Sequence, residues 1–173
     1  MTTPLSEPLT TAMTAVADAL AGLDWLIVGS VARALSGFAT TPRDLDIEVA
    51  AAQIDQAAVR LGLDVVAVRD ARASSRRATG EIAGVEIDLT AGLTLFGPGG
   101  ILPPDFDLMV QFATRATVAG HDILVAPLEE QIVRILISGN EDRRLRFVRE
   151  APSDYIARND YVELRLAAAR AAR

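Results

Sequence analysis

A strict alternation of acidic and apolar residues at positions 44–49 constrains the fold more than any other feature of the chain. Acidic residues stand at positions 44, 46 and 48, and each is followed by Leu, Ile or Val. Successive side chains of a β-strand point to opposite faces of its sheet. The segment therefore predicts a strand with Asp44, Asp46 and Glu48 on one face and three apolar side chains on the other.

Two more segments belong to the same sheet in this prediction. The continuous apolar run at residues 25–28 indicates a buried strand, and Gly29 and Ser30 end it before a short helix at 31–37. Residues 85–89 alternate again, with Glu86 and Asp88 on one face. Acidic side chains are thus expected on two separate strands.

The remaining patterns predict further helices and turns around this sheet. Residues 69–79 form a polar stretch to which no element is assigned, and residues 96–100 are expected to be a loop. The other expected elements are helices at 6–22 and 51–61, a strand at 65–68, hairpin turns at Ala83-Gly84 and Ala119-Gly120, a helix of about ten residues after Pro103-Pro104-Asp105, and helices from Leu128 onward with breaks near Gly139 and Pro152.

These patterns predict the fold class and the domain organisation. The fold class is α/β (α+β), with a mixed β-sheet core flanked by helices. We expect residues 1–126 to form this core and residues 127–173 to form a C-terminal helical segment packed on the same domain. No run reaches the roughly 18 apolar residues of a membrane helix, and the N-terminus lacks signal-peptide features. A cytoplasmic protein without membrane contact is expected.

Missing residue types exclude several kinds of chemistry. The chain has no Cys, which excludes thiol nucleophiles and cysteine-bound zinc. All 17 basic residues are Arg, so Schiff bases and a phosphate-binding lysine are excluded as well. His121 is the single histidine and is expected at the surface. Carboxylates, hydroxyls and guanidinium groups remain available for catalysis.

The net charge of −6 makes a long nucleic acid a poor candidate partner. Arginine clusters at 76–77 and 143–146 keep a short or structured nucleic acid open. The ordinary interpretation of the second cluster is a solvated helix face.

The chemistry left available suits phosphoryl transfer. Backbone amides at the start of a helix, together with the Ser30 hydroxyl, can bind nucleotide phosphates. Carboxylates from two neighbouring strands, Asp44 and Asp46 on one and Asp88 on the other, can hold hard cations that also bind phosphate oxygens. The alternative is that these aspartates are ordinary solvent-facing strand residues.

These motifs resemble the signature of the polymerase-beta-like nucleotidyltransferase superfamily. Residues 27–30, thirteen intervening residues and then Asp44-Leu45-Asp46-Ile47 match its pattern of Gly-Ser followed by Asp-hydrophobic-Asp. Residues 29–33, Gly-Ser-Val-Ala-Arg, resemble the minimal members, and residues 118–132 are similar to aminoglycoside-type and toxin-type members. The resemblance is closest over residues 25–50.

The resemblance implies a role for each matching residue. Asp44, Asp46 and Asp88 would be the catalytic residues and the ligands of two Mg²⁺ (or Mn²⁺) ions, and Asp88 would also help to deprotonate the acceptor. Gly29, Ser30 and Arg33 would bind the nucleotide, although Arg33 alone is more often a solvated helix residue. Arg134 stands in the region where related aminoglycoside enzymes often carry a lysine.

Three functions stay open at this point. The first is transfer of a nucleoside monophosphate from an NTP, with ATP as the first candidate, to a hydroxyl of a small molecule. The second is a toxin-type nucleotidyltransferase that acts on tRNA or protein, and the acidic net charge favours the first over tRNA. The third is a non-catalytic nucleotide-binding module of the same fold.

Overall fold

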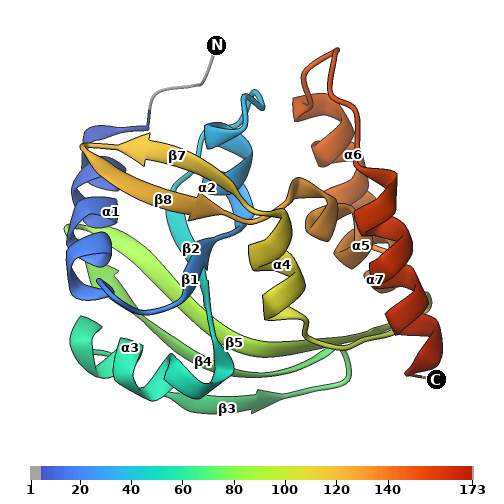
Figure 1. Ribbon diagram of the computed structural model, residues 1–173, viewed down its shortest axis with the longest axis horizontal. Coiled ribbons are helices and arrows are strands. Elements are labelled where there is room, and N and C mark those ends of the chain that lie inside the picture. Colours follow the sequence, from blue (N-terminus) through green and yellow to red (C-terminus); the bar gives the residue numbers. More distant parts are fainter. Residues whose placement is uncertain (1–4, 173) are drawn as a thin grey trace.

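The alternating segment forms strand β2 (Asp44–Val49) at the centre of a mixed β-sheet (Figure 1). The structure is a computed structural model, and it describes residues 5–172. Leu45, Ile47 and Val49 on the apolar face of β2 are at most 1% exposed. The acidic face of β2 is directed toward a cavity, as the alternation predicts.

The strand order of the sheet is β3-β4-β5-β2-β1-β8-β7, and β6 pairs with β5. β2 runs antiparallel to β1 and parallel to β5, whereas β4 and β5, and likewise β7 and β8, are antiparallel hairpins. The other strands are β1 (Trp25–Ile27), β3 (Val66–Arg69), β4 (Ala73–Ile82), β5 (Val85–Gly97), β6 (Gly100–Leu102), β7 (Thr114–Val118) and β8 (His121–Val125). The expected mixed sheet is confirmed.

Helices surround this sheet. Apolar residues of α1 and α3 pack with the apolar face of β2 in the main core, and α5, α6 and α7 gather at the other side of the molecule (Figure 1). The helices are α1 (Glu7–Ala19), α2 (Gly29–Leu35), the 3-10 helix η1 (Ala51–Gln53), α3 (Ile54–Leu61), α4 (Phe106–Phe112), α5 (Leu128–Ser138), α6 (Glu141–Glu150) and α7 (Asn159–Ala171).

Three segments differ from the expectation drawn from the sequence. The polar stretch at 69–79 contributes most of β4, which hydrogen-bonds to a strand on each side and buries only Ala78. Backbone hydrogen bonds to β3 and β5 hold β4 in the sheet, so its sequence shows little of the apolar periodicity of a half-buried strand. The expected loop at 96–100 is the tight turn between β5 and β6. The expected helix of about ten residues is α4, which has seven residues because Ala113 has an extended conformation and ends it.

The three C-terminal helices follow the predicted breaks. Gly139 ends α5 in the left-handed conformation, and Pro152 lies shortly after α6. Side chains of α5 and α7 share a hydrophobic cluster with β6. A division of the chain between residues 126 and 127 stays a prediction. Within residues 5–172, no helix combines the length and the apolar character that a membrane crossing needs.

Candidate active site

Gly29 lies where β1 passes into α2, and the adjacent β2 strand leaves no room there for a side chain. Its φ of +64° is a left-handed conformation that glycine adopts without strain. A Cβ atom at this position would lie 1.9 Å from Oδ2 of Asp46. The next residue, Ser30, donates a hydrogen bond from its Oγ to Oδ1 of Asp44 over 3.2 Å. The glycine-serine pair therefore lies directly against the first two aspartates.

The third aspartate comes from the neighbouring strand. In the parallel pairing of β2 with β5, Asp46 stands opposite Asp88. Both residues, together with Asp44, line one cavity of about 810 Å³. Glu86, which stands opposite Asp44, is exposed and does not line that cavity. Three aspartates from two adjacent strands therefore line the same cavity, and their joint role as metal ligands stays a prediction.

The electrostatics of this cluster are most evident at Asp46. Burial, together with the negative charges of Asp44 and Asp88, raises the pKa of Asp46 from 3.8 to about 6. The positive charges of Arg77 and Arg143 act in the opposite direction. A cation placed between these carboxylates would relieve their repulsion.

Arg77 already supplies such a positive charge to one of the carboxylates. From β4, its Nε and Nη2 atoms each donate a hydrogen bond of 2.6 Å to the two carboxylate oxygens of Asp88. With this arrangement, residues 5–172 contain no group of three or more His, Cys, Asp or Glu side chains positioned to hold a metal ion. Hard carboxylate oxygens suit Mg²⁺ or Mn²⁺. Asp88 would have to turn from Arg77, or share it, to join Asp44 and Asp46 around an ion.

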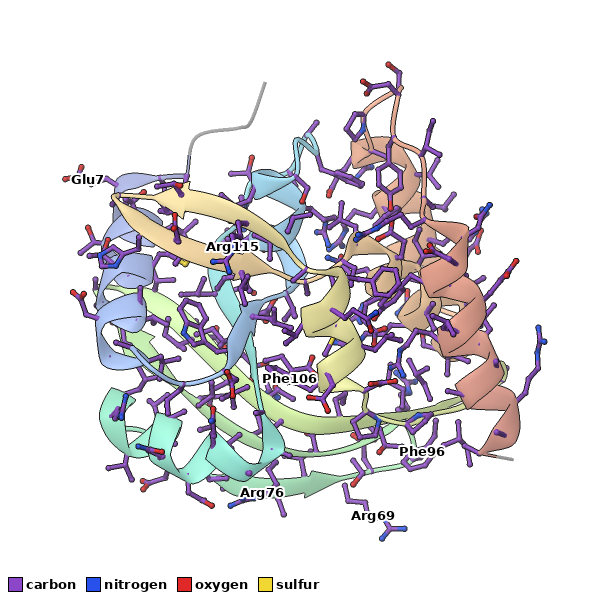
Figure 2. The ribbon with its side chains drawn as sticks, viewed as in Figure 1. Glu7, Arg69, Arg76, Phe96, Phe106 and Arg115 are labelled. Atoms are coloured by element: carbon purple, nitrogen blue, oxygen red, sulfur yellow. The ribbon has the colours of Figure 1, made fainter. Side chains whose placement is uncertain are left out.

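Neighbouring arginines of β4 project to opposite faces of the sheet. Arg76 extends to the lower side of the molecule in Figure 2, where Asp55 of α3 accepts its hydrogen bonds. Arg77 lies on the cavity side. The position of Arg77 can be inferred by counting back from the hairpin turn, since Thr79 pairs with Asp88 and Arg77 with Thr90. Because residues 69–79 are polar, the sequence did not indicate a strand there. The contact of Arg77 with Asp88 was therefore not predicted.

Arg33 lines the cavity but is already held by the protein. Its Nε donates to Oε2 of Glu150 over 3.1 Å, and its Nη1 donates to Oε1 of Gln131 over 2.7 Å. Gln131 in turn donates to the carbonyl oxygen of Gly29. Arg33 thus connects α2 to α5 and α6, and its contact with a nucleotide stays a prediction.

A buried ionic network lies beside the cluster. Glu48, the third acidic residue of β2, is 2% exposed and accepts a hydrogen bond of 2.7 Å from Arg134 of α5. Arg134 also donates to Glu130, which accepts further hydrogen bonds from Tyr161 and Arg165 of α7. Burial raises the pKa of Glu130, but the charges and hydrogen bonds of these partners outweigh it and hold that pKa below its usual value. The sequence indicates the face of Glu48 but not the identity of its partner.

Neither a protein-family model nor a curated protein matches the sequence. Solved structures do resemble the fold. A Thermotoga maritima protein, described as a candidate nucleotidyltransferase, superposes with a TM-score of 0.68 and 18% identity, over 84% of this chain and 93% of that chain.

Two further structures show lower similarity. ANT(2")-Ia in complex with adenylyl-2"-tobramycin gives a TM-score of 0.48 and 16% identity, covering 94% of this chain and 97% of that chain. Cid1 poly(U) polymerase gives 0.31 and 16% identity, covering 50% of this chain and 31% of that chain. The superposition on the Thermotoga maritima protein shows that this chain shares its fold, a mixed β-sheet flanked by helices.

Proposed function

We propose that this protein is a metal-dependent nucleotidyltransferase that moves a nucleoside monophosphate from an NTP to a hydroxyl group of an acceptor. ATP is the first candidate for the NTP. The observation that carries the proposal is the register of β2 and β5, which brings Asp46 beside Asp88 where Gly29 and Ser30 begin α2. In an ordinary solvent-facing strand pair, nothing would require carboxylates to cluster or a glycine to make room for one of them.

Asp44, Asp46 and Asp88 are the candidate ligands for Mg²⁺ or Mn²⁺. Their oxygen donors fit such ions, and burial, followed by the negative charges of Asp44 and Asp88, raises the pKa of Asp46. Bound divalent ions would supply positive charge to phosphate oxygens and to the departing pyrophosphate.

The residues of the chain have separate tasks in this proposal. The acceptor oxygen forms a bond to the α-phosphorus while the bond to the pyrophosphate oxygen breaks, and the acceptor proton passes to a carboxylate oxygen of Asp88. Ser30 and the backbone at Gly29 contact the phosphates, and the Ser30 hydroxyl also orients Asp44. The two-point hydrogen bond from Arg77 orients the carboxylate of Asp88.

Two aspartate variants test this division of tasks. Asp88→Asn is expected to lower kcat by about 10²-fold or more with little change in NTP affinity, because it removes an interaction made mainly in the transition state. Asp46→Asn is expected to abolish both turnover and metal-dependent NTP binding. The assay is steady-state transfer from labelled NTPs with Mg²⁺ or Mn²⁺ to pools of small molecules and of tRNA, with NTP affinity measured in parallel.

Glu86→Gln is the matched control, since it removes one negative charge from the same strand outside the cavity. It should turn over at the wild-type rate. Wild-type turnover by Asp88→Asn would remove Asp88 from the proposal. Labelling of tRNA but of no small molecule would favour the toxin-type function, and metal-dependent NTP binding without transfer to any pool would favour a non-catalytic module.

A further inference from the structure

The carboxylate of Asp88 is held from the side of β4, whereas the other two aspartates lie on β2. The strand order β4-β5-β2 places Arg77 and Asp46 on opposite sides of Asp88. Arg77 donates from Nε to Oδ1 and from Nη2 to Oδ2 of Asp88, at 2.6 Å each. The Thr90 hydroxyl, two residues further along β5, donates a longer bond of 3.4 Å to Oδ1. Arg77 therefore engages both oxygens of the carboxylate that a metal ion would share with Asp46.

This pairing has the geometry of a strong ion pair. A guanidinium that meets both oxygens of a carboxylate makes two parallel, charge-assisted hydrogen bonds. The side chains of Arg77 and Asp88 are 41% and 22% exposed, so water screens the pair only in part. Arg77 reaches Asp88 diagonally, because the residue opposite Arg77 in the β4–β5 register is Thr90. Another ligand of Asp88 has to compete with these two bonds.

The charge of Arg77 also reaches the rest of the aspartate cluster. It lowers the pKa of Asp46, whereas burial and the charges of Asp44 and Asp88 raise that pKa. Arg77 thus supplies part of the positive charge that a divalent ion would bring to the same carboxylates. While Asp88 keeps this pairing, no three His, Cys, Asp or Glu side chains within residues 5–172 are positioned to hold a metal ion. The guanidinium and an ion are therefore alternatives at Asp88.

We propose that Arg77 is a positioning residue that takes the place of a divalent ion at Asp88 and releases at least one oxygen of that carboxylate when an ion binds. The inference rests on the proposed function, because it concerns the metal ligands of that site. It adds a competition within the chain: Arg77 weakens the binding of ions, and Asp88 joins Asp44 and Asp46 around an ion only as Arg77 withdraws.

The Nε–H group of Arg77 reports this exchange directly. Its nitrogen–proton resonance, identified by its loss in the Arg77→Lys variant, depends on the hydrogen bond to Oδ1 of Asp88. Titration of the full chain with Mg²⁺, without nucleotide, is expected to shift this resonance until the site is saturated. The same titration of Asp46→Asn should leave the resonance in place, because this variant is expected to lose metal binding. A wild-type resonance that stays unmoved while calorimetry records Mg²⁺ binding would overturn the inference.

Mn²⁺ affinity separates the two-point bond from the charge of Arg77. Arg77→Lys keeps the charge without the two-point geometry, and it is expected to bind Mn²⁺ about 3- to 10-fold more tightly than the wild type. Arg77→Met loses both and is expected to bind Mn²⁺ about 10- to 100-fold more tightly. The measurement is the electron paramagnetic resonance signal of free Mn²⁺ during titration of the nucleotide-free protein.

Arg76→Met is the matched control, since it removes an arginine from the same strand on the opposite face of the sheet (Figure 2). Its Mn²⁺ affinity should stay within about twofold of the wild type. Arg77→Lys with wild-type affinity would show that only the charge of Arg77 acts, and would overturn the inference. Failure of Arg77→Met to bind Mn²⁺ more tightly would overturn it as well.

These titrations contain no nucleotide, so they separate the inference from the proposed function. Tighter Mn²⁺ binding by both Arg77 variants, with no transfer by the wild type to any acceptor pool, contradicts the nucleotidyltransferase proposal and supports the competition at Asp88. Transfer by the wild type, with unchanged Mn²⁺ affinity in both Arg77 variants, contradicts the role of Arg77 alone.

Discussion

Asp46 carries a carboxylate that the fold itself makes costly to ionise. Its surroundings raise its pKa to about 6, with burial as the largest cause and the charges of Asp44 and Asp88 next. The folded chain therefore binds this proton at a higher pH than the unfolded chain does. By linkage, the folded state loses stability as the pH rises from 3.8 to about 6 and does not regain it above that value.

Asp46→Asn is accordingly expected to stabilise the metal-free protein. Asparagine removes the charge that is costly above pH 6, so at pH 8 the free energy of unfolding should increase by an amount on the order of 1–3 kcal/mol. Near pH 3.8 the gain should largely disappear, because the wild-type carboxyl is then protonated in the folded state. Urea unfolding at both pH values measures this difference. A variant that is less stable than the wild type at pH 8 would contradict the account.

Within the elements, α5 is attached to its neighbours by charge as well as by apolar packing. Arg134 connects it to β2 through Glu48, and Glu130 connects it to α7 through Arg165. Arg165 is 1% exposed, and its Nη1 has no hydrogen-bond partner among the described residues. A buried ion pair of this kind contributes little net stability as a whole. The loss of one partner is nevertheless costly, because the other charge stays buried without compensation for its desolvation.

Arg165→Met is expected to lower the free energy of unfolding by about 3 kcal/mol, since Glu130 would lose its charged partner on α7 and keep only Tyr161 there. The control is Arg170→Ala, which removes an exposed arginine from the same helix and should cost less than about 0.5 kcal/mol. Urea unfolding provides the comparison. Combining Arg165→Met with Glu130→Gln should cost less than the sum of the two single changes. Additive losses would show that the two residues do not act as a pair.

At the scale of the whole molecule, folding gathers the negative charges of Asp44, Asp46 and Asp88 around one cavity of a chain whose net charge is −6. A triphosphate adds more negative charge to the same cavity. We therefore expect ATP alone to bind weakly and ATP with Mg²⁺ to bind more tightly, because the cation lies between charges that otherwise repel.

Thermal unfolding measures this coupling. ATP with Mg²⁺ at about 100 times its Kd should add about 2.7 kcal/mol of stability, which corresponds to a rise in Tm of roughly 5–10 °C for a domain of this size. ATP with EDTA should raise the Tm far less, and Asp46→Asn should show no metal-dependent increase. Equal stabilisation with and without the metal would indicate a plain phosphate pocket.

Features that depend on neighbours along the chain could be predicted from the sequence. The alternation at 44–49 specified β2 and its acidic face, because a strand turns every second side chain to the same side. The Gly29-Ser30 step specified the end of β1 and the start of α2. The hairpin turns at Ala83-Gly84 and Ala119-Gly120 followed from their glycines, which tolerate the positive φ angles that they adopt. The alanine before each glycine also has a positive φ, which its residue type does not favour.

Which side chains meet across the fold depended instead on how distant elements pack together. Arg77 reaches Asp88 because β4 pairs with β5, and β4 has too little apolar periodicity to be recognised before that pairing is known. Arg33 pairs with Glu150 from a helix more than a hundred residues away, so its place in a local motif did not reveal its partner. The face that a residue occupies is set by the period of its own element, whereas the partner of a long charged side chain is set by which elements the whole chain packs together.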